Sequence, residues 1–447
     1  MATVAEIRVH RGRRSEVALL AIAVLIAVLA RALVDYHADV LELRDLGIYA
    51  LTAVGLATTA HLVLRRYAPS ADTVLLPAVF ALNGIGIAMI RRIDFAYAER
   101  GRDTTFGNVQ IGWAILGIAL MIGVILLVRD HRVLRRYTYT AGLVGLIGLM
   151  LPLFPVIGTE INGARIWIHL FGRSLQPAEF AKIALVIFFA GYLVTNRDTL
   201  ALAGPKFLGM RFPRPRDMGP LVLVWLASML VQVYERDLGT SLLFFGVFLA
   251  MLYVATERLS WVIVGLGMFV AGAAFAGTVF AHVHSRYEAW LHALDPAVYA
   301  SGASEQLVRG LFGMASGGLL GTGLGEGRPD LVPYAESDFI ISSLGEELGL
   351  TGVMAILTLY VIIVQRAMRT AIGVRDGFGK LLAVGLGFSL ALQVFIVVGG
   401  VTRVIPLTGL TTPFLAYGGS SMLANWIVVG LILRISDQAR RPSQEVS

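Results

Sequence analysis

The chain has no cysteine and few charged residues. Without cysteine it can form no disulfide bond, no thiolate metal site and no thiol nucleophile. Only 15% of its 447 residues are charged, whereas 57% are hydrophobic. Such a chain has too few polar groups to cover a water-soluble globule of its size. The composition therefore excludes a soluble protein and indicates an integral membrane protein.

Acidic residues are scarcer than basic ones, which gives a formal net charge of +7. A basic excess can indicate a nucleic-acid-binding protein. Here, however, lysine and arginine occur in short clusters between apolar runs, a pattern typical of membrane topology. We therefore expect contact with membrane lipids and no nucleic-acid partner.

Apolar runs of about 17 to 23 residues recur along nearly the whole chain, and each can cross the roughly 30 Å of hydrocarbon as a helix. The predicted fold class is an all-α integral membrane protein, a polytopic helical bundle with about 12 transmembrane helices. The first run is too long for a typical signal peptide, so we interpret it as a retained helix. The predicted spans are 17–34, 47–64, 73–90, 108–128, 138–156, 179–195, 218–234, 238–256, 260–281, 338–365, 380–401 and 413–435.

The distribution of positive charge predicts the orientation. With the basic N-terminal segment in the cytoplasm, roughly twice as many Lys and Arg residues lie inside as outside, and both termini are cytoplasmic. Arg91, Arg92, Arg100 and Arg102 break this rule because they fall in an outer loop. The sequence FPRPRD, residues 212–217, falls inside and is interpreted as an anchor on anionic lipid.

Two outer segments, 156–177 and 282–337, are long and have no obvious regular structure. Loops of this length are usually functional. The chain has no convincing internal repeat and no mirrored pair of broken helices of the kind that marks many transporters. We therefore place the functional site in these outer segments.

Several ionisable residues fall where lipid should exclude them, which makes them functional candidates. Glu179 and Lys182 are spaced i and i+3 on one helical face and are predicted to form an ion pair. Pro177 is well placed to start their helix. A purely structural pair that holds helices together is an equally good explanation.

The charged positions share one predicted location, the outer face. Adjacent acids such as Glu346 and Glu347 cannot share a helical face, so at least one of them needs a basic or polar partner. A charged, hydrated rim above an apolar flank suits a substrate with an anionic head and a tail that stays in lipid, although solvated turns and helix-packing contacts would use the same residue types. The residues at the rim are Glu179, Lys182, Glu235, Asp237, Asp295, Asp338 and Arg403.

Five segments resemble, in their order and spacing, the motifs of the SEDS proteins, the shape, elongation, division and sporulation family that includes RodA and FtsW. The first two helices look like an addition to the ten-span core of that family, and the sequence is most similar to the RodA of actinobacteria. The segments are NGARIWI (162–168), QPAEFAK (176–182), DLGT (237–240), SDFIISSLGEELGLTG (337–352) and PLTGLTTPFLAYGGSSM (406–422).

This resemblance implies a peptidoglycan glycosyltransferase that polymerises lipid II, an undecaprenyl-pyrophosphate-linked disaccharide-peptide, into glycan strands for cell-wall elongation. It implies a multi-pass protein of the bacterial cytoplasmic membrane that works with a class B penicillin-binding protein as transpeptidase. The implied organisation is a basic tail (1–16), two added helices (17–72), the SEDS core (73–436) with an extracytoplasmic catalytic loop (282–337), and a cytoplasmic tail (437–447).

The resemblance also implies an essential aspartate in an Asp-Pro pair of the large outer loop. Asp295 is the candidate here, ahead of the Gly-rich segment 316–327. The chain departs from the family pattern at residues 301–306, which read SGASEQ where a Gly-Tyr-Gln run is usual. Ile166 stands where an arginine is common, and the neighbouring Arg165 could supply that charge.

These residues suit transfer of a sugar from a lipid-linked pyrophosphate. Asp295 is predicted to be the general base that takes the proton of the attacking hydroxyl. Cationic side chains, or a divalent cation such as Mg²⁺ or Mn²⁺, would stabilise the departing phosphates, and a single displacement would invert the anomeric centre. Lys182 and Arg403 are the candidates for binding these phosphates, with Glu179, Asp237 and Glu346 holding those cations or a metal. The predicted substrate-binding residues are Lys182, Glu179, Arg165, Trp167, Asp237, Glu346 and Arg403.

Three alternatives remain open from the sequence. An Asp-Pro pair in an outer loop is most often a turn former, so Asp295 could have no chemical role. A lipid II flippase would use the same rim charges but would need no base. A scaffold that only recruits the crosslinking enzyme would need neither the rim charges nor a base.

Overall fold

The computed structural model describes residues 2–161, 164–170, 172–197, 206–207, 210–211 and 215–441. Within this part of the chain, ten helices are long and apolar enough to cross a membrane. The chain is therefore a multi-pass membrane protein, as predicted. Three stretches singled out in the sequence fall outside the described residues: 162–163 of the NGARIWI motif, 212–214 of the inner basic segment, and 442–447 of the C-terminal tail.

A helix occurs at each of the twelve predicted spans. Two of them, α5 and α8, are not among the ten long apolar helices; α5 has 13 residues and is extended by the short 3-10 helix η2 (Leu151–Leu153). The twelve helices are α1 (Ala2–His37), α2 (Leu43–Tyr67), α3 (Leu75–Ala98), α4 (Phe106–Leu127), α5 (Thr138–Met150), α6 (Pro177–Thr195), α8 (Pro215–Glu235), α9 (Leu238–Thr256), α10 (Leu259–Val279), α14 (Ile340–Gly373), α15 (Gly377–Val401) and α16 (Gly419–Ala439).

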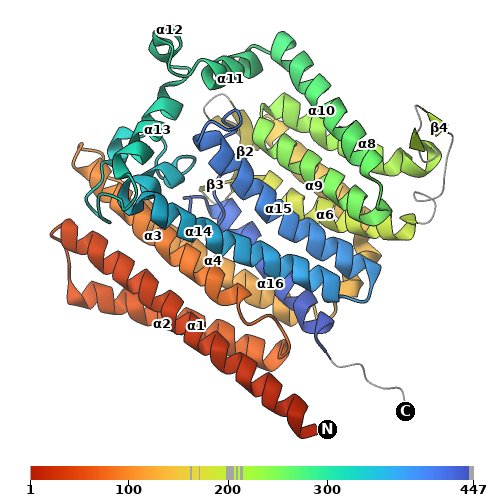
Figure 1. Cartoon of the computed structure of the whole chain (residues 1–447), viewed down its shortest axis with the longest axis horizontal. Coiled ribbons are helices and arrows are strands. Elements are labelled where there is room, and N and C mark those ends of the chain that lie inside the picture. Colours follow the sequence, from red (N-terminus) through yellow and green to blue (C-terminus); the bar gives the residue numbers. More distant parts are fainter. Residues whose placement is uncertain are drawn as a thin grey trace.

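The bundle has a buried centre and lipid-facing edges. Helices α3 and α16 are the most buried, whereas no residue in the apolar window of α10 is buried. The pair α1 and α2 packs on α3 and α4 at one edge, and α8 to α10 form the opposite edge (Figure 1). Residues 2–16 belong to α1 and are helical. The division into added helices and a core stays a prediction.

The outer segments contain regular structure that the sequence did not reveal. An antiparallel three-stranded sheet follows α5, and three short helices and a 3-10 turn lie in the large loop. The expectation that these segments lack regular structure was wrong, because such short elements depend on packing instead of on a local hydrophobic period. The elements are β1 (Gly158–Ile161), β2 (Ala164–Leu170), β3 (Arg173–Leu175), α11 (Ala281–Leu291), α12 (Pro296–Ala300), α13 (Glu305–Gly317) and η3 (Pro329–Leu331).

The end of the bundle opposite the 282–337 loop carries two further small elements. The 3-10 helix η1 (His131–Tyr137) precedes α5, and a two-stranded ribbon of β4 (Lys206–Phe207) and β5 (Met210–Arg211) precedes α8. Asp376 caps α15 and lies 2.9 Å from His131 Nε2, which ties η1 to the α14–α15 turn. These elements connect spans and lie away from the outer loops.

The last span begins later than predicted. The sequence suggested residue 413, but α16 starts at Gly419. The preceding segment bends instead, with positive φ angles at Arg403, Gly409 and Phe414. Its glycine and proline content explains the bend, because these residues disfavour a continuous helix.

Helix α14 is interrupted at Gly349, whose φ angle is +67°. A side chain at this position would collide with the backbone of Gly321, so only glycine fits. The freed carbonyl groups of Glu346 and Glu347 accept hydrogen bonds from backbone N–H groups of the Gly-rich segment 316–327. The break therefore fixes this segment against α14.

The arginines that break the positive-inside pattern are engaged within the protein. Three of them form ion pairs and the fourth lies over an aromatic ring. Because these contacts explain why the arginines lie at this end of the bundle, their position does not argue against the predicted orientation. The pairs are Arg91 with Asp35, Arg92 with Glu347, Arg100 with Asp330, and Arg102 with the ring of Tyr97.

Candidate active site

A cavity of about 730 Å³ opens at the end of the bundle that carries the 282–337 loop. We call it the motif cavity, because its walls come from segments far apart in the sequence that include parts of all five family-like motifs. Five helices, α4, α6, α9, α14 and α16, begin beside it, and helix N-termini favour anions. Its lining comes from α4, β2, residues 172–176, 236–237, α11, 302–307, 334–338 and 407–419.

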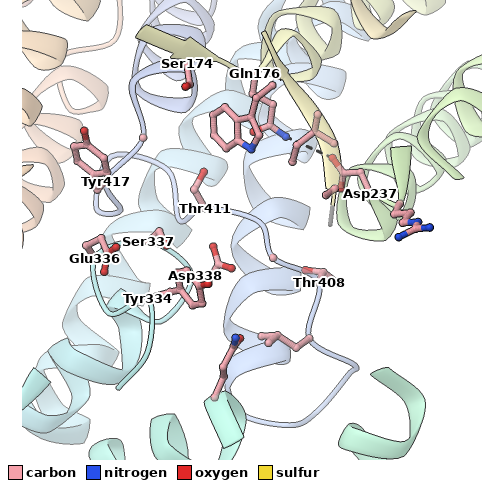
Figure 2. Close-up of a pocket in the computed structure, with 18 of the residues that line it drawn as sticks. Ser174, Gln176, Asp237, Tyr334, Glu336, Ser337, Asp338, Thr408, Thr411 and Tyr417 are labelled. Carbon is pink, nitrogen blue, oxygen red and sulfur yellow. Dashed lines mark hydrogen bonds between the residues drawn. The ribbon is translucent and has the colours of Figure 1, made fainter. Parts of the chain in front are cut away.

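Asp237 lies in one wall of the motif cavity (Figure 2). It caps α9, and its carboxylate accepts hydrogen bonds from the backbone N–H (2.9 Å) and the hydroxyl (2.6 Å) of Thr240. Gln176 Nε2 also donates to it at 3.4 Å. Burial raises the pKa of Asp237, although the bonds from Thr240 and the nearby charge of Arg286 oppose this rise.

Asp338 and Arg286 face the same cavity. Burial, and then the charge of Glu336, raises the pKa of Asp338 to about 7, with Arg286 acting in the opposite direction. Arg286 donates to the carbonyl oxygens of Leu407 (3.2 Å) and Thr408 (3.1 Å). Burial lowers the pKa of Arg286, and the two aspartates oppose that change.

The cavity therefore contains charges of both signs. Its arginines can bind an anionic group such as a phosphate, while its acids can accept hydrogen bonds or share a cation with that phosphate. Figure 2 shows Glu336 and Asp338 on one side of the cavity and Asp237 on another. The charged residues that line it are Arg173, Arg236, Asp237, Arg286, Glu336 and Asp338.

Asp295 does not line the motif cavity. It is exposed, and its carboxylate caps α12 by accepting a hydrogen bond from Ala297 N at 2.9 Å. Its neighbours Leu294 and Pro296 line a second cavity of about 840 Å³. Asp295 thus lies on the segment between two cavities. Its predicted role as general base stays a prediction.

The predicted Glu179–Lys182 ion pair is present, with Lys182 Nζ 2.8 Å from Glu179 Oε2. Lys182 also donates to Gln393 at 2.9 Å and to Asn425 at 3.4 Å. Both members of the pair are buried and neither lines the motif cavity. All the hydrogen bonds described for Lys182 are made inside the bundle. Its predicted contact with phosphate stays a prediction.

The remaining predicted residues are spread around the end of the bundle that carries the 282–337 loop. Trp167 lines the motif cavity, whereas Arg165 does not, and Arg165 Nε is buried without a hydrogen-bond partner in the described structure. Arg403 donates to the carbonyl oxygens of Trp290 and Leu291, both at 2.7 Å, and so holds the end of α11. Glu346 lines the second cavity.

Sequence reasoning gave no role to Arg286, although this residue faces both cavity aspartates. The signal was weak, because a single arginine in a polar loop shortly after the predicted span 260–281 has no distinctive pattern. Only its place on α11 brings it to the cavity. Asp338 was counted among the rim charges but was given no individual role.

The described side chains do not form a complete binding site for a divalent cation. Among the described residues, no group of three or more His, Asp or Glu side chains could hold a metal ion. Mg²⁺ commonly binds to one or two carboxylates together with substrate phosphates. Asp237 and Asp338 could therefore contribute to such a site only in combination with a bound phosphate.

Comparisons with known proteins define the class. The family described as "Cell cycle protein", which comprises FtsW, RodA and SpoVE, matches residues 73–441. The chain therefore belongs to the FtsW/RodA/SpoVE family of membrane proteins. It is 50% identical over 432 residues to the peptidoglycan glycosyltransferase RodA of Mycobacterium tuberculosis, covering 96% of this chain and 92% of that protein.

A probable peptidoglycan glycosyltransferase FtsW of Trichlorobacter lovleyi is 35% identical over 372 residues, covering 82% of this chain and 93% of that protein. The higher identity to a mycobacterial RodA confirms the predicted likeness to actinobacterial RodA. A solved structure described as "Structural coordination of polymerization and crosslinking by a peptidoglycan synthase complex" superposes with a TM-score of 0.66, at 24% identity, over 83% of this chain and 99% of that one. This likeness confirms the fold.

Proposed function

We propose that the chain is a peptidoglycan glycosyltransferase that polymerises lipid II into glycan strands for cell-wall elongation. The observation that carries this proposal is the motif cavity, where segments from all five family motifs meet at the end of the bundle that carries the 282–337 loop. Arginines, acids and five helix N-termini surround this space, which suits the anionic pyrophosphate of a lipid-linked sugar. The RodA and FtsW names of the relatives support the same activity.

The chemical step is a single displacement. A sugar hydroxyl attacks the anomeric carbon of a second, lipid-linked sugar, and the bond from that carbon to the pyrophosphate oxygen breaks. The lipid pyrophosphate leaves with the electron pair, and Asp295 takes the proton of the attacking hydroxyl as general base. The anomeric centre is inverted because no covalent enzyme intermediate forms.

The leaving pyrophosphate needs positive charge around it. Arg286 is the best-placed side chain of the cavity, because two backbone carbonyls fix its guanidinium beside Asp237 and Asp338. A divalent cation, Mg²⁺ or Mn²⁺, would be held by one of these carboxylates together with the phosphates and would supply further charge neutralisation.

Trp167 of β2 forms part of the same wall and would contact the sugar. Arg165 and Glu346 are proposed as further substrate contacts at the rim. Lys182 and Arg403 could bind phosphate only by exchanging some of the contacts that they make in the structure. The proposed role of Glu179 is to position Lys182.

The proposed setting is the bacterial cytoplasmic membrane, with both termini in the cytoplasm and the motif cavity outside. Membrane lipids surround the bundle, and a class B penicillin-binding protein is the proposed crosslinking partner. The charge distribution supports this orientation. The similar solved structure is described as a synthase complex that coordinates polymerisation and crosslinking, and it supports a partner of this kind by analogy.

The test is an assay of the purified protein with lipid II, with and without the class B partner and with and without Mg²⁺. We expect glycan polymer from the chain with its partner. A purified protein that moves lipid II across a vesicle membrane but forms no glycosidic bond would contradict the proposal and favour a flippase.

A further inference from the structure

A second cavity, of about 840 Å³, lies between α12, α13 and η3. We call it the α13 cavity. Its walls are mainly apolar, and Phe312 at 65% and Tyr299 at 39% exposure present aromatic rings there. Exposed aromatic side chains around a hollow are typical of ligand sites. Neither ring lines the motif cavity.

A buried acid points to a ligand in the α13 cavity. Glu346 is only 6% exposed; its Oε1 accepts a hydrogen bond from Arg328 N at 2.8 Å, whereas its Oε2 has no hydrogen-bond partner in the described structure. A Cβ atom placed on Gly313, in the cavity wall, would lie 3.9 Å from this oxygen. Buried acceptors are rarely left unsatisfied, so this oxygen is available to accept a hydrogen bond from a hydroxyl or amide N–H that reaches it from the cavity.

The two arginines of the α13 cavity are engaged elsewhere. Arg309 lies 2.7 Å from Glu305, and the guanidinium of Arg328 donates to both oxygens of Asp330. The cavity therefore offers an acceptor oxygen and apolar walls more than positive charge. This chemistry suits the hydroxyl and amide groups of a saccharide better than a pyrophosphate.

One segment separates the two cavities. Trp290 and Gly302 face the motif cavity, while Leu294, Pro296 and Phe312 face the α13 cavity. Asp295 lies on this same segment, which runs from α11 to α13. Asp295 lines neither cavity itself, but its neighbours Leu294 and Pro296 line the α13 cavity.

We propose that the α13 cavity binds the acceptor saccharide, the lipid-linked sugar whose hydroxyl attacks, while the motif cavity holds the pyrophosphate of the donor. This inference rests on the proposed function. Polymerisation joins two lipid-linked sugars, so the protein needs two sites that meet at the reacting atoms. A pyrophosphate links both sugars to their lipids, but only the donor's develops charge as it leaves and so requires the arginines. The acceptor presents its reacting sugar, with hydroxyl and amide donors, to Glu346.

Two lipid II analogues separate the sites. The acceptor-only analogue carries a non-leaving ether in place of the pyrophosphate, so it can only be attached to. The donor-only analogue lacks the attacking hydroxyl, so it can only give up its pyrophosphate. A mixture of the two can form one glycosidic bond and no more. In Glu346→Gln the amide oxygen keeps the bond from Arg328 N but Oε2 is lost as an acceptor. We expect this variant to raise KM for the acceptor-only analogue about tenfold, the effect of one hydrogen bond, with KM for the donor-only analogue unchanged.

A second variant fills the cavity without touching Glu346. Ser316 is exposed and lines the α13 cavity, so Ser316→Trp should occupy it and raise the same acceptor KM about tenfold or more. Leu320→Trp is the matched control, because Leu320 is 83% exposed on the same Gly-rich segment and lines neither cavity. It should leave both KM values unchanged.

The inference is overturned if both cavity variants melt as the unaltered protein does and leave acceptor KM unchanged, or change donor and acceptor KM equally. Failure of the proposed function looks different: the unaltered protein would then form no bond between the two analogues and no polymer from lipid II. That result would remove the inference together with the activity on which it depends.

Discussion

Asp338 carries a charge that depends on pH near neutrality. Because its pKa is raised to about 7, the carboxyl group is mostly protonated at pH 6 and mostly ionised at pH 8. Its ionised fraction therefore rises about tenfold across this window. Only the ionised form attracts a cation or pairs with Arg286. The motif cavity should therefore bind a divalent cation more tightly as pH rises.

We expect the apparent affinity of the polymerisation reaction for Mg²⁺ to increase about tenfold from pH 6 to pH 8, in proportion to that ionised fraction. Asp338→Asn should remove this dependence. Titrating Mg²⁺ at three pH values measures it, with Glu288→Gln on α11, outside the cavity lining, as the control. A Mg²⁺ affinity that does not change with pH in the unaltered protein would count against Asp338 as a cation ligand.

Lys182 and Glu179 form a buried pair whose members depend on each other. In Lys182→Met the carboxylate of Glu179 loses its cation inside the bundle, which should cost about 3–5 kcal/mol of unfolding free energy. Thermal unfolding in detergent measures the loss. The double variant Glu179→Gln with Lys182→Met should recover most of it, because no uncompensated charge remains.

The double variant also separates structure from phosphate binding. Recovery of both stability and glycan synthesis would contradict a phosphate contact by Lys182. Recovery of stability alone would support that contact. The i, i+3 spacing was sufficient to predict the pair, but the additional contacts with Gln393 and Asn425 come from α15 and α16 and could not be predicted from local spacing.

At the scale of elements, Arg403 connects the bend before α16 to α11. Its guanidinium bridges the carbonyl oxygens of Trp290 and Leu291, shortly before Asp295 begins the next helix. Arginine can donate to two carbonyls at once, and lysine is a point charge that reproduces this geometry poorly. We therefore regard Arg403 as a positioning residue for the Asp295 segment.

Arg403→Lys should lower kcat about tenfold with little change in KM, because a misplaced base affects the transition state more than binding. Hydrogen exchange in residues 286–300 should become faster in the variant. A large rise in KM with unchanged exchange would instead indicate that Arg403 binds the phosphates directly. Exposed Arg132, on η1 and far from this segment in the bundle, offers a control as Arg132→Lys.

The elements themselves were predictable to different degrees. The spans followed from length and apolarity, and Pro177 marked the start of α6. The sheet β1–β3 and the helices α11 to α13 could not be seen, since short elements in a polar loop are fixed by contacts with distant segments. The break at Gly349 was equally hidden, because its cause lies in the approach of Gly321.

For the whole molecule, the absence of cysteine makes the orientation directly testable. A single cysteine introduced as Ser301→Cys, in the exposed outer loop, should react with a membrane-impermeant maleimide in spheroplasts. Arg132→Cys, exposed on η1, should react only after the membrane is opened. The reverse pattern would place the motif cavity in the cytoplasm and would exclude extracellular polymerisation.

The candidate site could be predicted only in part. Of the rim charges predicted from the sequence, the structure places Asp237 and Asp338 in the motif cavity, together with the predicted Trp167. Arg286 was missed, and the location of Asp295 between two cavities could not be foreseen, because both depend on how α11 to α13 fold over the bundle.

The central claim is that a carboxylate on this outer segment removes a proton from a sugar while the lipid anchor stays in the membrane. The most direct measurement is the single-turnover rate of glycosidic bond formation by Asp295→Asn, with saturating lipid II and the class B partner. Loss of a general base should slow this step about 10²–10⁴-fold, with lipid II binding and melting temperature retained. A rate within about threefold of the unaltered protein would contradict the claim.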